Sequence, residues 1–299
     1  MSKKMSMAAK KRMEGYCFIL PGFLYVVLVL GYPLVYKIIL SFKDTNVKNF
    51  AKGTSVFVGF QNYISLIHDS TFQLVFKNTI VFTIACLVVQ FTIGFILAVF
   101  FSQKFSIAGP IRGLILVAYM MPMSVTALLG KNLFGVSEGV INDLLMKIGI
   151  IHEPIEWLVS SSTAMFAVIA VNCWVGIPFN MLLLTSGLTG ISEDVYESAS
   201  LDGANRMQRF FYITLPLMKS SILAVLMLGF IYTFKAFDLM FIMTKGGPLN
   251  STDVLGTYAY TLSFTKYEFS MGAAAAMILF CCLFVIGLFY LKLISKEDE

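Results

Sequence analysis

The chain alternates long apolar stretches with short polar ones. Windows without Asp, Glu, Lys or Arg run over 15–36, 78–103, 113–130, 157–192, 220–234 and 269–291. About 20 apolar residues cross the hydrocarbon core of a bilayer, so these windows predict a polytopic membrane protein with six transmembrane helices. No polar stretch between them is long enough for a further domain of ordinary size.

The predicted fold is all-α, and its boundaries follow from the windows. We expect a cytoplasmic basic segment over 1–14 and a membrane domain over 15–295. Its helices are expected at about 15–36, 78–101, 112–130, 163–186, 219–243 and 269–292. The window 157–192 is too long for one straight span, because a helix of that length would reach about 54 Å. Gly176 and Pro178 predict a kink in its helix.

Composition agrees with this class and excludes several functions. Apolar residues make up 58% of the chain and charged residues 13%, which is far from a soluble domain. All five cysteines lie inside apolar windows, and the two histidines, His68 and His152, are far apart. We therefore expect no disulfide framework, no metal site and no catalytic residues. The net charge of +5 is attributed to the basic flank of the first helix rather than to nucleic-acid binding.

Charge alone leaves the orientation in the membrane almost balanced. An even number of spans puts both termini on one side. With the N-terminus inside, twelve Lys and Arg lie inside and ten outside. The five basic residues between Lys3 and Arg12 flank the first helix, whose flanking charge usually dominates. We therefore expect both termini in the cytoplasm.

A polar segment between the fourth and fifth predicted helices has the pattern of two short helices. Glu193, Asp194 and Glu197 favour a helix N-terminus. Gly203 interrupts that helix, and a second apolar stripe follows over 210–215. These features are also consistent with an amphipathic hairpin at the membrane surface.

The spacing in this segment resembles the EAA signature of membrane subunits of ATP-binding-cassette importers. Six of its seven positions agree, and Ser198 stands where alanine is usual; the matching residues are Glu197, Ala199, Gly203, Ile213, Leu215 and Pro216. The resemblance implies a type I importer membrane-domain fold in which 192–218 forms a cytoplasmic coupling loop. This loop would lie in a groove of a separate ATPase subunit.

The resemblance also implies roles for individual residues. Glu197 would form a charge-assisted bond with the ATPase, Ala199 would pack closely, and Gly203 would form the turn. The full implied coupling set is Glu197, Ser198, Ala199, Asp202, Gly203, Ala204, Leu215 and Pro216. This implied coupling role places residues 192 and 219 in the cytoplasm, in agreement with cytoplasmic termini.

Two further motifs resemble the carbohydrate-importing branch of these permeases. Lys245-Gly246-Gly247-Pro248, followed by Ser251-Thr252, is similar to an outer loop of that branch. The run from Asn172 to Phe179 resembles the segment that lines the sugar site of the maltose type. The implied substrate-path residues are Asn172, Val175, Gly176, Phe179, Gly229, Tyr232 and Thr233. Aromatic rings can hold sugar faces, and amides or hydroxyls can bond sugar hydroxyls.

Some features of this path leave alternatives open. Gly229 and Thr233 stand where the maltose type has a hydroxyl and an amide, which argues against maltose itself. Asn172 is equally consistent with a bond to a neighbouring helix, with Trp174 packed against the protein. Lys235 and Asp238, at i and i+3, can pair on one helix face. They form either a hydrated wall of the substrate path or a pair at the wetted outer interface.

The predicted function is a permease subunit that imports a sugar, expected to be a di- or oligosaccharide, by alternating access across the cytoplasmic membrane of a prokaryote. Gly130-Lys131 lacks the rest of a phosphate loop, so ATP and Mg are expected on partner subunits and no cofactor on this chain. Expected partners are a second homologous permease in a heterodimer, two cytoplasmic ATPases, an extracytoplasmic sugar-binding protein and the lipid bilayer. The alternative is an ion-coupled secondary transporter of a small polar solute, which needs ion-coupling residues at mid-membrane.

Overall fold

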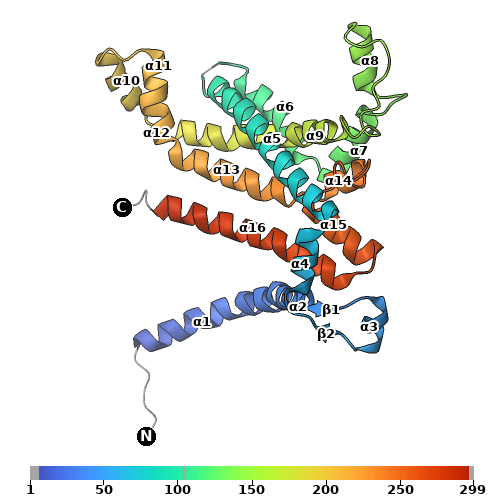
Figure 1. Cartoon of the computed structure of the whole chain (residues 1–299). Coiled ribbons are helices and arrows are strands. Elements are labelled where there is room, and N and C mark those ends of the chain that lie inside the picture. Colours follow the sequence, from blue (N-terminus) through green and yellow to red (C-terminus); the bar gives the residue numbers. More distant parts are fainter. Residues whose placement is uncertain (1–6, 104, 296–299) are drawn as a thin grey trace. The chain divides into compact units, whose positions relative to one another are not determined.

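The computed structural model describes residues 7–103 and 105–295, and they are mostly helical (Figure 1). Within these described residues, five helices are long and apolar enough to cross a membrane, and a bent helix pair raises the number to as many as 6. The predicted all-α class is therefore confirmed. Residues 1–6 of the predicted basic segment lie outside the described residues, and 7–14 begin the first helix.

The chain divides into two units, Met1–Leu66 with Ala259–Met277, and Ile67–Tyr258 with Ile278–Glu299. The helical and strand elements up to the second unit are α1 (Met7–Val26), η1 (Val27–Gly31), α2 (Tyr32–Ser41), β1 (Lys43–Asp44), α3 (Val47–Lys52), β2 (Val56–Phe57) and α4 (Gln61–His68). The two strands pair antiparallel, with Lys43 opposite Phe57. Asn62 fixes this turn, because its side-chain amide donates to the carbonyls of Ser41 and Lys43.

The remaining elements are α5 (Ser70–Phe101), α6 (Ala108–Met120), α7 (Met123–Leu133), α8 (Val140–Lys147), α9 (Ala164–Thr189), α10 (Glu193–Leu201), α11 (Arg206–Arg209), η2 (Phe210–Thr214), α12 (Leu215–Leu217), α13 (Lys219–Phe234), α14 (Asp238–Met243), α15 (Leu255–Tyr260), η3 (Thr261–Thr265) and α16 (Phe269–Ser295). In Figure 1, α9 and α13 run side by side, and α5 crosses α9.

Small residues allow the membrane helices of the second unit to approach closely. A Cβ atom added to Gly94 of α5 would lie 2.6 Å from Cβ of Asn180 on α9. A Cβ on Gly130 of α7 would lie 2.6 Å from Cγ2 of Val171, also on α9. Because lipid does not drive apolar helices together, such close backbone approach is a main source of packing energy in a membrane. These two glycines therefore fix α5 and α7 against α9.

Two predicted helices are broken in the structure. The single helix expected over 112–130 is instead α6 and α7, bent by 94°. Met121 precedes Pro122 and takes an extended conformation, because the proline ring disfavours the helical region for the residue before it. The helix expected over 219–243 stops at Phe234 and resumes at Asp238.

Other helices begin or end at residues that differ from the predicted ones, and the order of the helices is unchanged. The first helix starts before the predicted residue 15 and continues to Ser41 through a π turn just before Pro33. An added residue in that turn accommodates the ring of the proline. The helix expected from residue 78 starts at Ser70. α9 continues through Pro178 without a break.

The loop after α14, which contains the Gly-Gly-Pro motif, is fastened to the first turns of α5. The amide of Asn78 donates to the carbonyls of Asn250 and Asp253, at 2.8 Å and 3.2 Å. The Thr79 hydroxyl accepts the Leu255 N–H at 3.0 Å. These buried side chains satisfy backbone groups that would otherwise be left unpaired. The loop is thus an ordered part of the second unit.

Asp69 caps α5 and joins it to the same region. Its carboxylate accepts the N–H of Thr71 at 2.7 Å and the hydroxyl of Tyr258 at 2.9 Å. Partial burial raises the pKa of Asp69, but these hydrogen bonds outweigh burial, and the pKa lies below its ordinary value.

We expect Asp69→Ala to lower the free energy of unfolding at pH 7 by about 1 kcal/mol, because the helix loses its N-cap. Since the folded-state pKa is lowered, the stabilisation by the carboxylate is complete above the ordinary pKa of about 3.9 and is lost as the pH falls through the lower folded value. Thermal unfolding of the detergent-solubilised protein should therefore show a difference in Tm at pH 7 that shrinks in strong acid. The exposed loop variant Glu153→Ala is the control, and an equal Tm for Asp69→Ala and wild type at pH 7 would contradict the assignment.

Candidate functional site

A cavity of about 280 Å³ lies among the membrane helices of the second unit. Its lining comes from α5, α6, α7, α9 and α13. The lining residues are Gln90, Tyr119, Met123, Asn172, Val175, Gly176, Phe179, Gly229, Tyr232 and Thr233. The structure thus brings together the predicted substrate-path residues between Asn172 and Thr233 in one space.

Aromatic rings form one wall of this cavity. The ring centroid of Phe179 lies 5.4 Å from that of Tyr119, and the two planes are inclined by 30°. The Phe179 ring also meets Tyr232 edge to face, with centroids 5.9 Å apart. Rings arranged in this way present apolar faces of the kind on which the C–H face of a sugar ring can rest.

Buried polar groups also line the cavity. Gln90, Asn172 and Thr233 are 3%, 7% and 5% exposed. The side-chain Nε2 of Gln90 donates to the backbone carbonyl of Asn172 at 3.3 Å, which joins α5 to α9. Amide and hydroxyl groups can both donate to and accept from sugar hydroxyls. The cavity therefore combines an apolar face with a polar edge.

Two glycines keep this space open. A Cβ on Gly176 would overlap with Cδ of Gln90, and one on Gly229 would lie 2.9 Å from Cδ2 of Leu87. Any larger residue at Gly176 would displace the Gln90 amide. Gln90 was not predicted from the sequence, although an amide near the middle of an apolar window is a usable signal. Nor were Tyr119 and Met123, which join the site only because the chain bends between them.

Lys235 and Asp238 do not line the cavity. The break after Phe234 separates them, so the expected i, i+3 helix face is not present. The amine of Lys235 lies over the ring of Tyr232, 5.1 Å from its centroid, in a cation–π geometry. Trp174 is 62% exposed on α9, and so it does not pack into the interior of this chain.

The segment that carries the EAA-like spacing forms a helical hairpin. Ser192 caps α10 by accepting the N–H of Asp194. Gly203 follows the helix with φ of 80°, a left-handed conformation that glycine adopts without a steric penalty. Asn205 and Gln208 then form a reciprocal capping box at the start of α11. The helix, glycine turn and helix expected from the sequence are therefore present.

Two side-chain contacts close the hairpin. The Tyr196 hydroxyl lies 3.0 Å from the Thr214 hydroxyl oxygen, and Arg209 donates to the Ser200 hydroxyl at 2.8 Å. The predicted coupling residues divide by exposure: Glu197, Ser198, Asp202, Gly203 and Pro216 are exposed, while Ala199, Ala204 and Leu215 are half-buried. The carboxylate of Glu197 is thus on the surface, and the two alanines pack at the turn.

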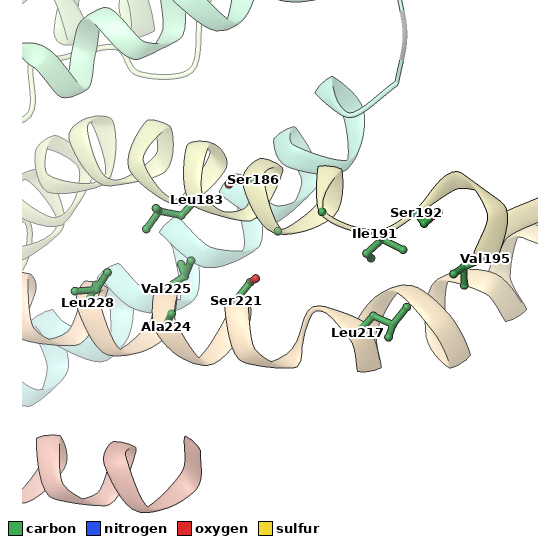
Figure 2. A pocket seen from close by; sticks show the side chains of 12 residues that line it. Leu183, Ser186, Ile191, Ser192, Val195, Leu217, Ser221, Ala224, Val225 and Leu228 are labelled. Carbon is green, nitrogen blue, oxygen red and sulfur yellow. The ribbon is translucent and has the colours of Figure 1, made fainter. Parts of the chain in front are cut away.

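A second and larger cavity of about 630 Å³ adjoins this hairpin. Figure 2 shows its side chains facing one another across the gap between the end of α9 and the start of α13, with Ile191, Ser192 and Val195 at one end. α9 and α13 approach closely beside it, since a Cβ on Gly187 would lie 2.6 Å from the Ser221 hydroxyl oxygen. This cavity was not predicted from the sequence.

Comparison with known proteins identifies relatives over nearly the whole chain. Residues 90–296 match the family model described as binding-protein-dependent transport system inner membrane component. The sulfoquinovosyl glycerol transport system permease protein of Agrobacterium fabrum is 30% identical, and the alignment covers 96% of this chain and 92% of that protein. The diacetylchitobiose uptake system permease protein of Streptomyces coelicolor is also 30% identical, over 95% and 87% of the two chains.

A solved structure shares the fold. The crystal structure of a bacterial transporter involved in the import of the acidic polysaccharide alginate contains a chain with a TM-score of 0.82 to this one. The two chains are 22% identical, and the match covers 97% of this chain and 98% of the other. The two chains therefore share one fold over nearly their whole length.

We expect Gly203→Ala to destabilise the hairpin by about 1–2 kcal/mol, because alanine pays a steric penalty at positive φ. Nothing lies within 4 Å of the added Cβ, so the effect comes from the backbone alone. Gly203→Asn should be milder, since asparagine tolerates this conformation better than alanine. Limited proteolysis of residues 193–216 should report the change, with Gly190→Ala at a helical φ of −75° as control. Equal protection in all three variants would refute the strain argument.

Proposed function

Because the chain belongs to the family of binding-protein-dependent transport system inner membrane components, we propose that it forms the path along which an oligosaccharide crosses the cytoplasmic membrane. The chain is a permease subunit of a sugar importer of the ATP-binding-cassette class and not itself an enzyme. ATP hydrolysis belongs to a separate subunit.

The cavity lined by Asn172, Phe179 and Tyr232 is the observation that carries the sugar proposal. It lies within membrane helices and offers aromatic faces beside buried amide and hydroxyl groups, the combination that sugar rings require. The two permease relatives are named for sulfoquinovosyl glycerol and diacetylchitobiose, both of which are glycosides. These names support a carbohydrate as the substrate class.

The hairpin over 192–218 is proposed as the coupling element. Its exposed Glu197 would bond a basic residue of a cytoplasmic ATPase, and the Gly203 turn sets the angle between its helices. Two ATPase subunits would bind ATP and Mg, and a second, homologous permease would complete a heterodimer. An extracytoplasmic binding protein would deliver the sugar. This arrangement requires the hairpin and both termini on the cytoplasmic side.

The proposed cycle is alternating access. Closure of the ATPase pair would pull on the hairpin and move α9 and α13, which carry both the hairpin and the cavity. The cavity would open outward to receive sugar and inward to release it. An ion-coupled mechanism is not favoured, because none of the residues given above for the cavity lining is charged.

Reconstitution tests the energy source. Proteoliposomes that contain the complete complex should accumulate radiolabelled trehalose or diacetylchitobiose only when the binding protein is outside and ATP is inside. Uptake of these sugars by the permease subunits alone, without ATPase subunits, would contradict the proposal and support a secondary transporter.

We expect Glu197→Arg to lower co-purification of the ATPase subunits and sugar-stimulated ATP hydrolysis at least about tenfold, because it reverses the charge offered to the partner. Glu138→Arg, an exposed residue outside the hairpin, is the matched control and should assemble normally. Full assembly and activity of Glu197→Arg would argue against coupling through this hairpin.

A further inference from the structure

Gln90 is a buried amide in the middle of a membrane helix. It lies on α5, is 3% exposed, and borders the 280 Å³ cavity. An amide removed from water is costly unless its hydrogen-bonding groups find partners. Its side-chain Nε2 donates to the carbonyl of Asn172 on α9 at 3.3 Å.

That bond does not explain why an amide is present. Asn172 lies in the interior of α9, where each backbone carbonyl already accepts the N–H four residues further along the helix. α9 is therefore satisfied without Gln90. An apolar residue of similar length would fill the same volume without the cost of burying an amide. The amide is better explained by a partner that enters the cavity.

The amide of Gln90 packs directly against Gly176. An added Cβ there would overlap with Cδ, Oε1 and Nε2 of Gln90. Glycine inside a helix costs about 1 kcal/mol relative to alanine, yet alanine would push the amide away. Gly176 and the Asn172 carbonyl together fix the plane of the amide at the cavity wall.

We propose that Gln90 binds the transported sugar directly. The N–H groups of its amide face the Asn172 carbonyl and the Cys173 thiol, and the amide oxygen accepts a hydrogen bond from a sugar hydroxyl. The aromatic wall around Phe179 and Tyr232 holds the ring face. Gln90 then determines which hydroxyl pattern the permease accepts. The inference rests on the proposed import of a sugar.

The test combines substitution of Gln90 with removal of single hydroxyl groups from the sugar, in the manner of a double-mutant cycle. This cycle separates sugar binding from helix packing. The complete complex, as wild type and as Gln90→Met, is reconstituted with its binding protein and ATP. Methionine keeps the length of the side chain but has no amide. Uptake is measured for whichever of trehalose and diacetylchitobiose is taken up faster, and for the series of monodeoxy analogues of that sugar.

Asn180→Leu is the matched packing control. Asn180 is a second buried amide at the crossing of α5 and α9, it donates to the Gly176 carbonyl at 2.8 Å, and it is not among the cavity-lining residues. Loss of the Asn180 amide should change the uptake of the full sugar and of every monodeoxy analogue by the same factor. Gln90→Leu, which also has no amide, replaces Gln90→Met in the cycle should the latter not assemble.

We expect Gln90→Met to lower kcat/KM for the full sugar about tenfold, the effect of one lost hydrogen bond. One monodeoxy analogue lacks the hydroxyl that Gln90 binds. For this analogue kcat/KM should be equal for wild type and variant, because the hydrogen bond to Gln90 is absent in both. A loss that is the same for every analogue would overturn the inference and assign Gln90 to packing. No ATP-dependent uptake of any sugar by the assembled wild type would overturn the proposed function, and this inference with it.

Discussion

The structure depends on one constraint of the bilayer: every backbone N–H and C=O within the hydrocarbon must be bonded inside the protein. The membrane segments therefore form helices, and the packing between them comes from close approach rather than from the hydrophobic effect. Gly94 against Asn180, Gly130 against Val171 and Gly187 against Ser221 are points of such approach. They fasten α5, α7 and α13 to α9, which becomes the central helix of the second unit.

The same constraint explains where the helices are interrupted. Irregular backbone is tolerated at membrane depth only where protein or a cavity receives the freed groups. One break, between α6 and α7, separates Tyr119 from Met123, and both residues line the smaller cavity. The other follows α13 shortly after Tyr232 and Thr233, which line it as well. The breaks thus lie next to residues that line the smaller cavity.

Two helices connect the cavity with the hairpin. α9 carries Asn172 and Phe179 in its middle, and its C-terminal end leads to the Ser192 cap of α10. α13 carries Gly229 and Tyr232, and its start borders the 630 Å³ cavity beside the hairpin. Since a packed helix moves as a rigid element, displacement of the hairpin would reach the cavity without any change in side-chain chemistry. Tyr196 and Arg209 keep the hairpin itself closed.

The sequence by itself determined the features that depend on local spacing. Apolar windows predicted the spans and Gly203 predicted the turn. The resemblance to the maltose type implied Asn172, Val175, Gly176 and Phe179, which share one helix face, and Gly229, Tyr232 and Thr233 on another helix. Only the tertiary structure decided which further residues join them. Gln90, Tyr119 and Met123 meet that face through packing between distant segments, and the break after Phe234 removed Lys235 and Asp238 from it. Periodicity gives direction within one helix, whereas the position of one helix against another is set by the side chains at their crossing.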